Sequence, residues 1–185
     1  MKKLTLTLMT ATFAVACVFG QGPKMTKEQS SMKGKETKTE KPALRRLEGN
    51  EVSSIAMNNF RKDFPRASNV QWTRADMFDE AGFSVDGKTY KAFYDYESNL
   101  VGTTTPKTIK DLPANAQKEI STKYKDYTPR GVLLFDDNQI NETDMLLYGT
   151  QFDDADNYFV ELAKGSDVIV VRVAMDGDVY FFKNL

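Results

Sequence analysis

The stretch that decides the fold is residues 64–72, which read Phe64-Pro65-Arg66-Ala67-Ser68-Asn69-Val70-Gln71-Trp72. Because a residue before proline avoids the helical region, Phe64-Pro65 ends the helix that precedes it. Alternation of Val70 and Trp72 then predicts a strand over residues 69–74. About sixty residues later, after a second helical pattern, a partial echo follows: Tyr127-Thr128-Pro129-Arg130-Gly131-Val132-Leu133-Leu134. A unit used twice predicts a surface with two lobes that is built for binding.

Two helices are predicted, one ahead of each of these stretches. The first has apolar residues at helical spacing and Asn50 as its cap: Val52, Ile55, Ala56 and Phe60. The second starts near Pro113, where a missing N–H costs nothing, and has its own apolar stripe: Ala116, Ile120 and Tyr124.

Strands are predicted over residues 69–74, 83–85, 90–96, 100–105, 131–135, 145–152, 158–163, 168–174 and 179–182. Asp86-Gly87, Ser98-Asn99 and Asp176-Gly177 mark turns between them. The links are too short for crossovers, so the sheet is antiparallel. The predicted fold is α+β, with two tandem repeats at about residues 50–106 and 107–185. In each repeat a helix packs on an antiparallel sheet of about four strands, and one sheet face stays open.

The N-terminus predicts a signal peptide over residues 1–20. A basic start is followed by an uncharged apolar run, residues 4–19, which is short for a membrane span. A short membrane anchor is the alternative. The only cysteine, Cys17, follows a weak lipobox, so a lipid anchor at Cys17 is a second, less favoured alternative. We therefore expect a secreted or periplasmic protein without a disulfide framework.

Charge divides the rest of the chain into two blocks. Residues 21–49 carry eight basic and four acidic residues, with few large apolar ones, which predicts a disordered basic linker. Residues 50–185, the predicted domain, carry 15 basic and 22 acidic residues. The net charge of the whole chain is −1, so no attraction to nucleic acid is expected.

The composition excludes several classes of enzyme. The chain has no histidine, and its single cysteine lies in the predicted signal peptide, so His bases, thiol nucleophiles and zinc sites are not expected. No phosphate-binding loop or nucleophile elbow is present. An enzyme that needs only carboxylates, such as a glycosidase, stays open, although no acidic pair is specified by spacing. We predict a protein that is not an enzyme and needs no cofactor.

An acidic stretch, residues 136–157, lies within the second half and has no Lys or Arg. One interpretation is a calcium site formed by Asp153, Asp154, Asp156 and Asn157. The spacing lacks the Gly and the terminal Glu of a regular calcium loop, so a solvated acidic loop is the favoured interpretation. A surface that steers a basic partner is the third.

Aromatic side chains are frequent in the predicted strands. Five tyrosines are candidates for partner binding: Tyr90, Tyr94, Tyr96, Tyr148 and Tyr158. Aromatic residues are also frequent in strands simply because they pack well there. We therefore expect a core role and a contact role equally for these tyrosines. The single tryptophan, Trp72, is predicted to be a core residue.

Several of these segments resemble a known family, the PepSY-like or β-lactamase-inhibitor-protein-like (BLIP-like) domains of secreted Bacteroidetes proteins. The resemblance is carried by residues 60–65, 69–72 and 94–101 and by Leu112-Pro113, and it covers roughly residues 50–185. It implies helix-plus-sheet repeats with a concave sheet face, across which the better-known inhibitors bind a hydrolase. No inhibitory residue can be carried over. In the family a Gly usually follows the Asp in the Asp-Tyr-Glu-Ser type of turn, whereas this turn uses Ser98-Asn99.

Together these observations predict a non-enzymatic binding module, secreted or periplasmic and inhibitor-like. It would engage a protein partner, of the hydrolase class by resemblance, through the open sheet face. The alternative is an envelope protein that binds a small ligand or calcium.

Overall fold

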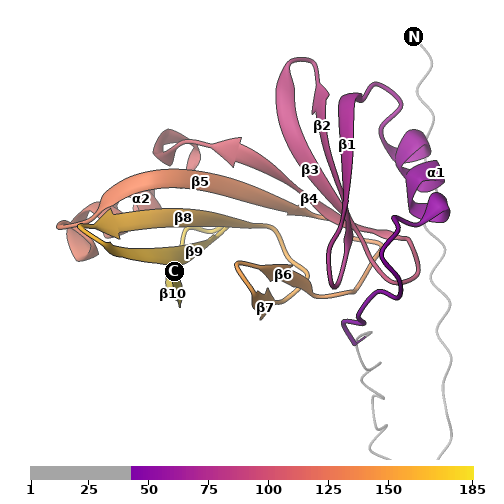
Figure 1. Ribbon diagram of the computed structural model, residues 1–185. Helices are drawn as coiled ribbons and strands as arrows, with labels where there is room; N and C mark the ends of the chain where they lie inside the picture. Colours follow the sequence, from indigo (N-terminus) through magenta and orange to yellow (C-terminus); the bar gives the residue numbers. More distant parts are fainter. Residues whose placement is uncertain (1–42) are drawn as a thin grey trace, which may run out of the picture. The chain divides into compact units, whose positions relative to one another are not determined.

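The computed structural model describes residues 43–185 (Figure 1). The predicted signal peptide 1–20, Cys17 and most of the predicted linker lie outside the described residues. The helices are α1 (Ser54–Asp63), the short 3₁₀ helix η1 (Ile109–Asp111) and α2 (Ala114–Lys123). The strands are β1 (Ser68–Arg74), β2 (Asp79–Val85), β3 (Lys88–Tyr94), β4 (Leu100–Lys107), β5 (Thr128–Asp137), β6 (Met145–Leu147), β7 (Thr150–Phe152), β8 (Asn157–Lys164), β9 (Asp167–Ala174) and β10 (Val179–Asn184).

Eight strands form one antiparallel sheet in the order β1-β2-β3-β4-β5-β8-β9-β10. The α+β class and the antiparallel pairing are thus confirmed. Each helix is followed along the chain by four strands of this sheet, but the two sets do not form separate sheets. They join where β4 pairs with β5 over six residue pairs, from Gly102↔Asp137 to Lys107↔Val132.

The helices begin and end for local reasons that the sequence shows in part. The side-chain oxygen of Ser53 accepts hydrogen bonds from the Ile55 and Ala56 N–H groups, at 3.2 and 3.4 Å. Ser53 therefore caps α1, and the predicted cap, Asn50, is wrong. The helix ends at Asp63, ahead of Phe64-Pro65, as predicted. α2 starts directly after Pro113 and buries Ala116 and Ile120.

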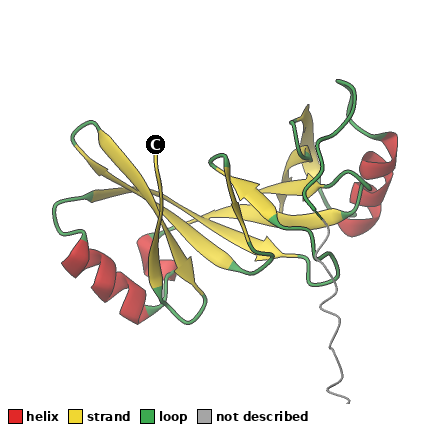
Figure 2. Cartoon of the chain, turned by 90° about the horizontal axis from the view of Figure 1, so that it is seen from below, coloured by secondary structure: helices red, strands yellow, loops and turns green. Residues whose placement is uncertain are grey.

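Both helices pack on the same face of the sheet, which we call the helix face. Figures 1 and 2 show α1 and α2 far apart, one near each end of the sheet. α1 buries Ala56 and Phe60 against four residues of β2 and β3: Ala81, Phe83, Ala92 and Tyr94. Ile55 is 61% exposed, so the predicted first stripe is too wide. Trp72 packs against this core, with its ring centroid 5.4 Å from that of Phe60.

The opposite face of the sheet is covered over its middle, whereas the sequence predicted one open face. Its buried side chains come from β3, β4, β5, β8 and β9: Phe93, Val101, Phe135, Phe159 and Val170. Met145 and Phe152 of the β6–β7 hairpin, Phe78 and Leu44 pack onto them. The prediction of an open face therefore needs correction, because a second apolar core fills the centre of that face.

The hairpin itself corrects another prediction. Residues 145–152 were expected to be one strand, but β6 and β7 form a separate two-stranded sheet. The turn between them is Tyr148-Gly149, with φ of 52° and 69°. Positive φ at both central residues is typical of the two-residue turns that match strand twist. Tyr-Gly is not the usual Asn-Gly or Asp-Gly signal for such a turn, so the sequence pattern did not indicate it.

The domain also starts earlier than predicted. The Leu47 N–H donates to the Asp76 carbonyl at 2.8 Å, and Arg46 forms an ion pair with the Asp76 side chain at 3.0 Å. Leu44 packs on the second core. The last residues of the predicted linker, 44–49, are thus part of the folded domain rather than disordered.

Candidate functional site

The five candidate tyrosines do not form one surface. Tyr94 is fully buried beneath α1, and its hydroxyl donates to Asp63 Oδ2 at 2.9 Å. Burial, with this hydrogen bond to a carboxylate, raises the pKa of Tyr94 well above its ordinary value. Tyr90 stacks on Phe83 in the same core, with ring centroids 5.6 Å apart. Of the two predicted roles of Tyr94, the contact role is wrong and the core role holds, because strand alternation directs its ring toward α1.

The other three tyrosines lie apart from one another. Tyr158 packs against the core beneath α2 on the helix face. Tyr148 lies in the hairpin turn on the opposite side, where its hydroxyl donates to Glu161 Oε1 at 2.9 Å. Tyr96 lies in the β3–β4 turn, with the Arg45 guanidinium 3.7 Å from its ring centroid. Partner binding by the half-buried Tyr90, Tyr96, Tyr148 and Tyr158 stays a prediction.

Two of the four calcium candidates, Asp156 and Asn157, have local structural roles. Asp156 Oδ1 accepts the Asp137 N–H at 2.8 Å. Asn157 is buried, and its amide donates to the Ala155 carbonyl at 2.8 Å. Asp153 is exposed and Asp154 half-exposed. Within residues 43–185 no group of three or more acidic, His or Cys side chains is arranged to hold a metal ion. The calcium site stays a prediction that the geometry does not favour.

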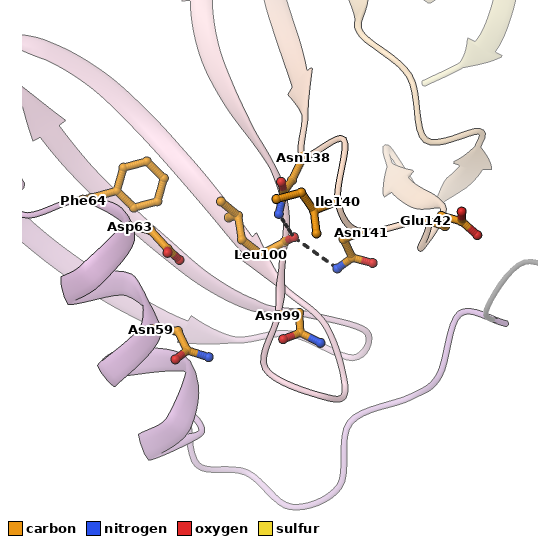
Figure 3. A pocket seen from close by; sticks show the side chains of 9 residues that line it. All are labelled: Asn59, Asp63, Phe64, Asn99, Leu100, Asn138, Ile140, Asn141 and Glu142. Carbon is orange, nitrogen blue, oxygen red and sulfur yellow. Dashed lines mark hydrogen bonds between the residues drawn. The ribbon is translucent and has the colours of Figure 1, made fainter.

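A groove that no sequence pattern indicates lies between the C-terminal end of α1, the start of β4 and the loop after β5. It has a volume of about 810 Å³ and is lined by Asn59, Asp63, Phe64, Asn99, Leu100, Asn138, Ile140, Asn141 and Glu142 (Figure 3). Phe64 and Leu100 give it an apolar wall. Four amides and two carboxylates supply hydrogen-bonding groups, without a basic side chain. The groove is suited to a ligand that brings hydrogen-bond donors or positive charge.

The loop on one side of the groove, residues 138–142, is held by its own asparagines. Asn138 Nδ2 donates to the Leu100 carbonyl at 2.7 Å, and Asn141 Nδ2 donates to the same carbonyl at 3.1 Å. Asn141 also donates to Asp95 Oδ2 at 2.9 Å. Figure 3 shows the two amides converging on Leu100. The loop is therefore anchored at both ends to the start of β4.

Between these two anchors lies Ile140, whose side chain is 91% exposed. A single exposed apolar residue is common on protein surfaces and needs no explanation. Ile140 differs because it lies between two anchored asparagines and borders the groove. The backbone that carries such a side chain needs little further ordering when Ile140 enters a pocket on a partner. The signal in the sequence is an isolated isoleucine within a polar stretch, Asn138-Gln139-Ile140-Asn141.

The groove shows no arrangement of a nucleophile and a base. Asp63 accepts the Tyr94 hydroxyl, and Asn59 donates to the Ser98 carbonyl at 2.9 Å. Asp136 has its pKa raised by burial and then by the Asp156 carboxylate. It lies outside the groove lining. The site therefore offers apolar and hydrogen-bonding contacts, which is typical of a binding surface.

No family model and no curated protein sequence matches this chain. Solved structures do match. A BLIP-like protein from Bacteroides fragilis has a TM-score of 0.56 at 16% identity, covering 73% of this chain and 87% of its own. A DUF2874 family protein from Bacteroides uniformis has a TM-score of 0.60 at 14% identity, covering 72% and 90%. Another, from Bacteroides ovatus, has a TM-score of 0.59 at 14% identity, covering 74% and 89%.

These matches extend over most of each neighbour and over the α+β region of this chain. The helices of residues 43–185 include none long and apolar enough to cross a membrane. At these identities the likeness establishes the fold and not the activity. The chain has the fold of the BLIP-like and DUF2874 proteins of Bacteroides.

Proposed function

We propose that this protein is a non-enzymatic binding module that engages a protein partner outside the cytoplasm. The observation that carries the proposal is Ile140, held 91% exposed on an anchored loop beside an amide-lined groove. Apolar anchors that are rigid before binding contribute most of the affinity at many interfaces. The apolar leader at residues 1–20 supports export, and the lack of histidine supports a role without catalysis.

The proposed binding surface is the groove with Ile140, whereas the sequence predicted the open face of the sheet. A partner that bound only the centre of the sheet face opposite the helices would meet the β6–β7 hairpin there. The groove and the loop lie at the start of β4 and the end of β5, where Ile140 projects. The partner class we propose is a hydrolase, by analogy with the BLIP-like neighbour, and the interaction would then be inhibitory.

The partner surface should be complementary to this site. Asp63 and Glu142 make the groove acidic, and no Lys or Arg of the described part of the chain lines it. We therefore expect a partner that places a basic side chain in the groove and an apolar pocket over Ile140. Attraction of this kind speeds association and weakens as salt is added.

Site-specific photo-cross-linking tests the proposal. A photoreactive amino acid is placed at position 140 and, as a control, at Met175, which is 50% exposed in the β9–β10 turn. In native cell envelopes we expect one protein adduct from position 140 and none of that mass from position 175. The same adducts from both positions, or none from position 140, would contradict the proposal.

A further inference from the structure

The two edges of the large sheet are different in character. Within residues 43–185, β1 and β10 are the outermost strands of the sheet, and each pairs with one neighbour only. β1 exposes mostly polar side chains, with Val70 as its one exposed large apolar residue, and is interrupted by a bulge near Asn69, whose φ is 54°. Bulges and polar residues are devices that keep an edge strand from pairing with another chain.

The β10 edge carries apolar side chains instead. Tyr180 is 46% exposed and Phe181 is 56% exposed, and Leu185 just after the strand is 56% exposed. β10 has an irregularity of its own, between Phe181 and Lys183, so the regular part is residues 179–181. Since β9 occupies one side of β10, alternate backbone N–H and C=O groups on the other side face outward. A second chain in an extended conformation can form hydrogen bonds with these outward-facing N–H and C=O groups.

β10 has acidic residues just before its start and a basic residue near its end. Its charges are therefore complementary to those of a second β10 that runs antiparallel to it. Asp176 and Asp178 lie just before the strand, and Lys183 lies near its end. Lys183 donates to the Tyr148 carbonyl and keeps further N–H donors for another acceptor. An antiparallel second copy would place each Lys183 near the partner's aspartates and Tyr180 and Phe181 near their own counterparts. A parallel copy would bring like charges together.

We propose that β10 pairs antiparallel with β10 of a second copy of this chain, which joins two sheets into one across a twofold axis. The interface is isologous, so it closes after two copies. β1 at the other edge exposes mostly polar side chains and does not extend the assembly. The groove beside Ile140 is lined by α1, β4 and the loop after β5, so the dimer keeps it available to a partner.

The first test is the oligomeric state of the purified protein as a function of concentration. Sedimentation equilibrium should show a monomer–dimer equilibrium in the micromolar range, as expected for a small interface. Phe181→Lys should weaken the dimer at least about tenfold, because a charge replaces a central apolar contact. The matched control, Val70→Lys, changes a 38% exposed residue on the β1 edge and should leave the dimer unchanged. Thermal melting of each variant shows whether it is folded.

A second test shows which strands pair between the two copies, and it needs no variant that breaks the dimer. In a Cys17→Ser background, Tyr180→Cys should form a disulfide-linked dimer under mild oxidation, and Gln71→Cys on β1 should not. A protein that stays monomeric up to about 100 µM would overturn the proposal, since self-pairing that weak has no role at ordinary concentrations. Equal cross-linking from both edges would overturn it as well. A monomer whose β10 captures an added peptide would show that the edge serves another chain.

Discussion

At the residue scale, the alternation of aromatic residues in β3 was correctly read as a strand, but the direction of each face was not. Tyr90, Ala92 and Tyr94 share one face, which lies under α1. Tyr96 was predicted on the same face of this strand, which is wrong, because β3 ends at Tyr94 and Tyr96 lies in the turn. Sequence period fixes which residues are together and leaves open which side a helix will cover. The helix decides it here, because Phe60 packs on this face.

Replacement of Tyr94 by Phe tests its buried role through pH. The raised pKa of Tyr94 in the folded protein means that folding keeps its proton, whereas the unfolded chain releases it near the ordinary value of 10.0. The contribution of Tyr94 to stability should therefore be constant below that pH and fall as pH rises above it. In Tyr94→Phe the fall should be smaller, which urea unfolding at several alkaline pH values would measure. An unchanged pH slope in the variant would contradict the burial of this phenol.

At the element scale, the helix positions, most strands and the Asp86-Gly87 turn could be predicted, because they depend on neighbours in the sequence. The joining of two sets of four strands into one sheet could not. It depends on a contact between β4 and β5, across more than twenty residues of chain. The groove was missed for the same reason, since its walls come from three distant segments.

Gly102 has no side chain, and this allows β4 to pack closely against β5. A Cβ at this position would lie 2.7 Å from the Asp136 carbonyl oxygen and 2.7 Å from the Phe135 ring. We expect Gly102→Ala to lower the free energy of unfolding by about 1–3 kcal/mol, because a packed core must shift. In Gly131→Ala, the matched control on β5, the added Cβ meets nothing within 4 Å. Chemical denaturation of both variants measures the difference, and equal stabilities would contradict the packing described.

The anchored loop gives a second prediction at this scale. Asn141→Ala removes the hydrogen bonds to Asp95 and Leu100 without removing Ile140. The affinity for the partner cross-linked from position 140 should fall about threefold to tenfold, because the loop then pays an ordering cost on binding. Gln139→Ala, in the same loop and bonded to Asp137 only, is the control. If the two variants bind alike, the preorganisation of this loop is not what confers affinity.

At the scale of the whole molecule, the binding-module account and the calcium alternative differ in a melting experiment. A calcium site at Asp153, Asp154, Asp156 and Asn157 would raise the melting temperature in millimolar calcium, since a ligand that binds only the folded state stabilises it. The binding-module account predicts no shift, because Asp156 is used by the Asp137 N–H. A rise that Asp156→Asn abolishes would favour the calcium alternative.

The proposed binding function depends on Ile140 as an exposed anchor for a protein partner. The most direct measurement is the affinity of the partner identified by cross-linking for the native protein, for Ile140→Ala and for Met175→Ala. We predict that Ile140→Ala binds at least about tenfold more weakly, which is typical of a central apolar anchor. Met175→Ala should bind like the native protein, and all three should melt alike. Equal affinity of Ile140→Ala and the native protein would contradict the central claim.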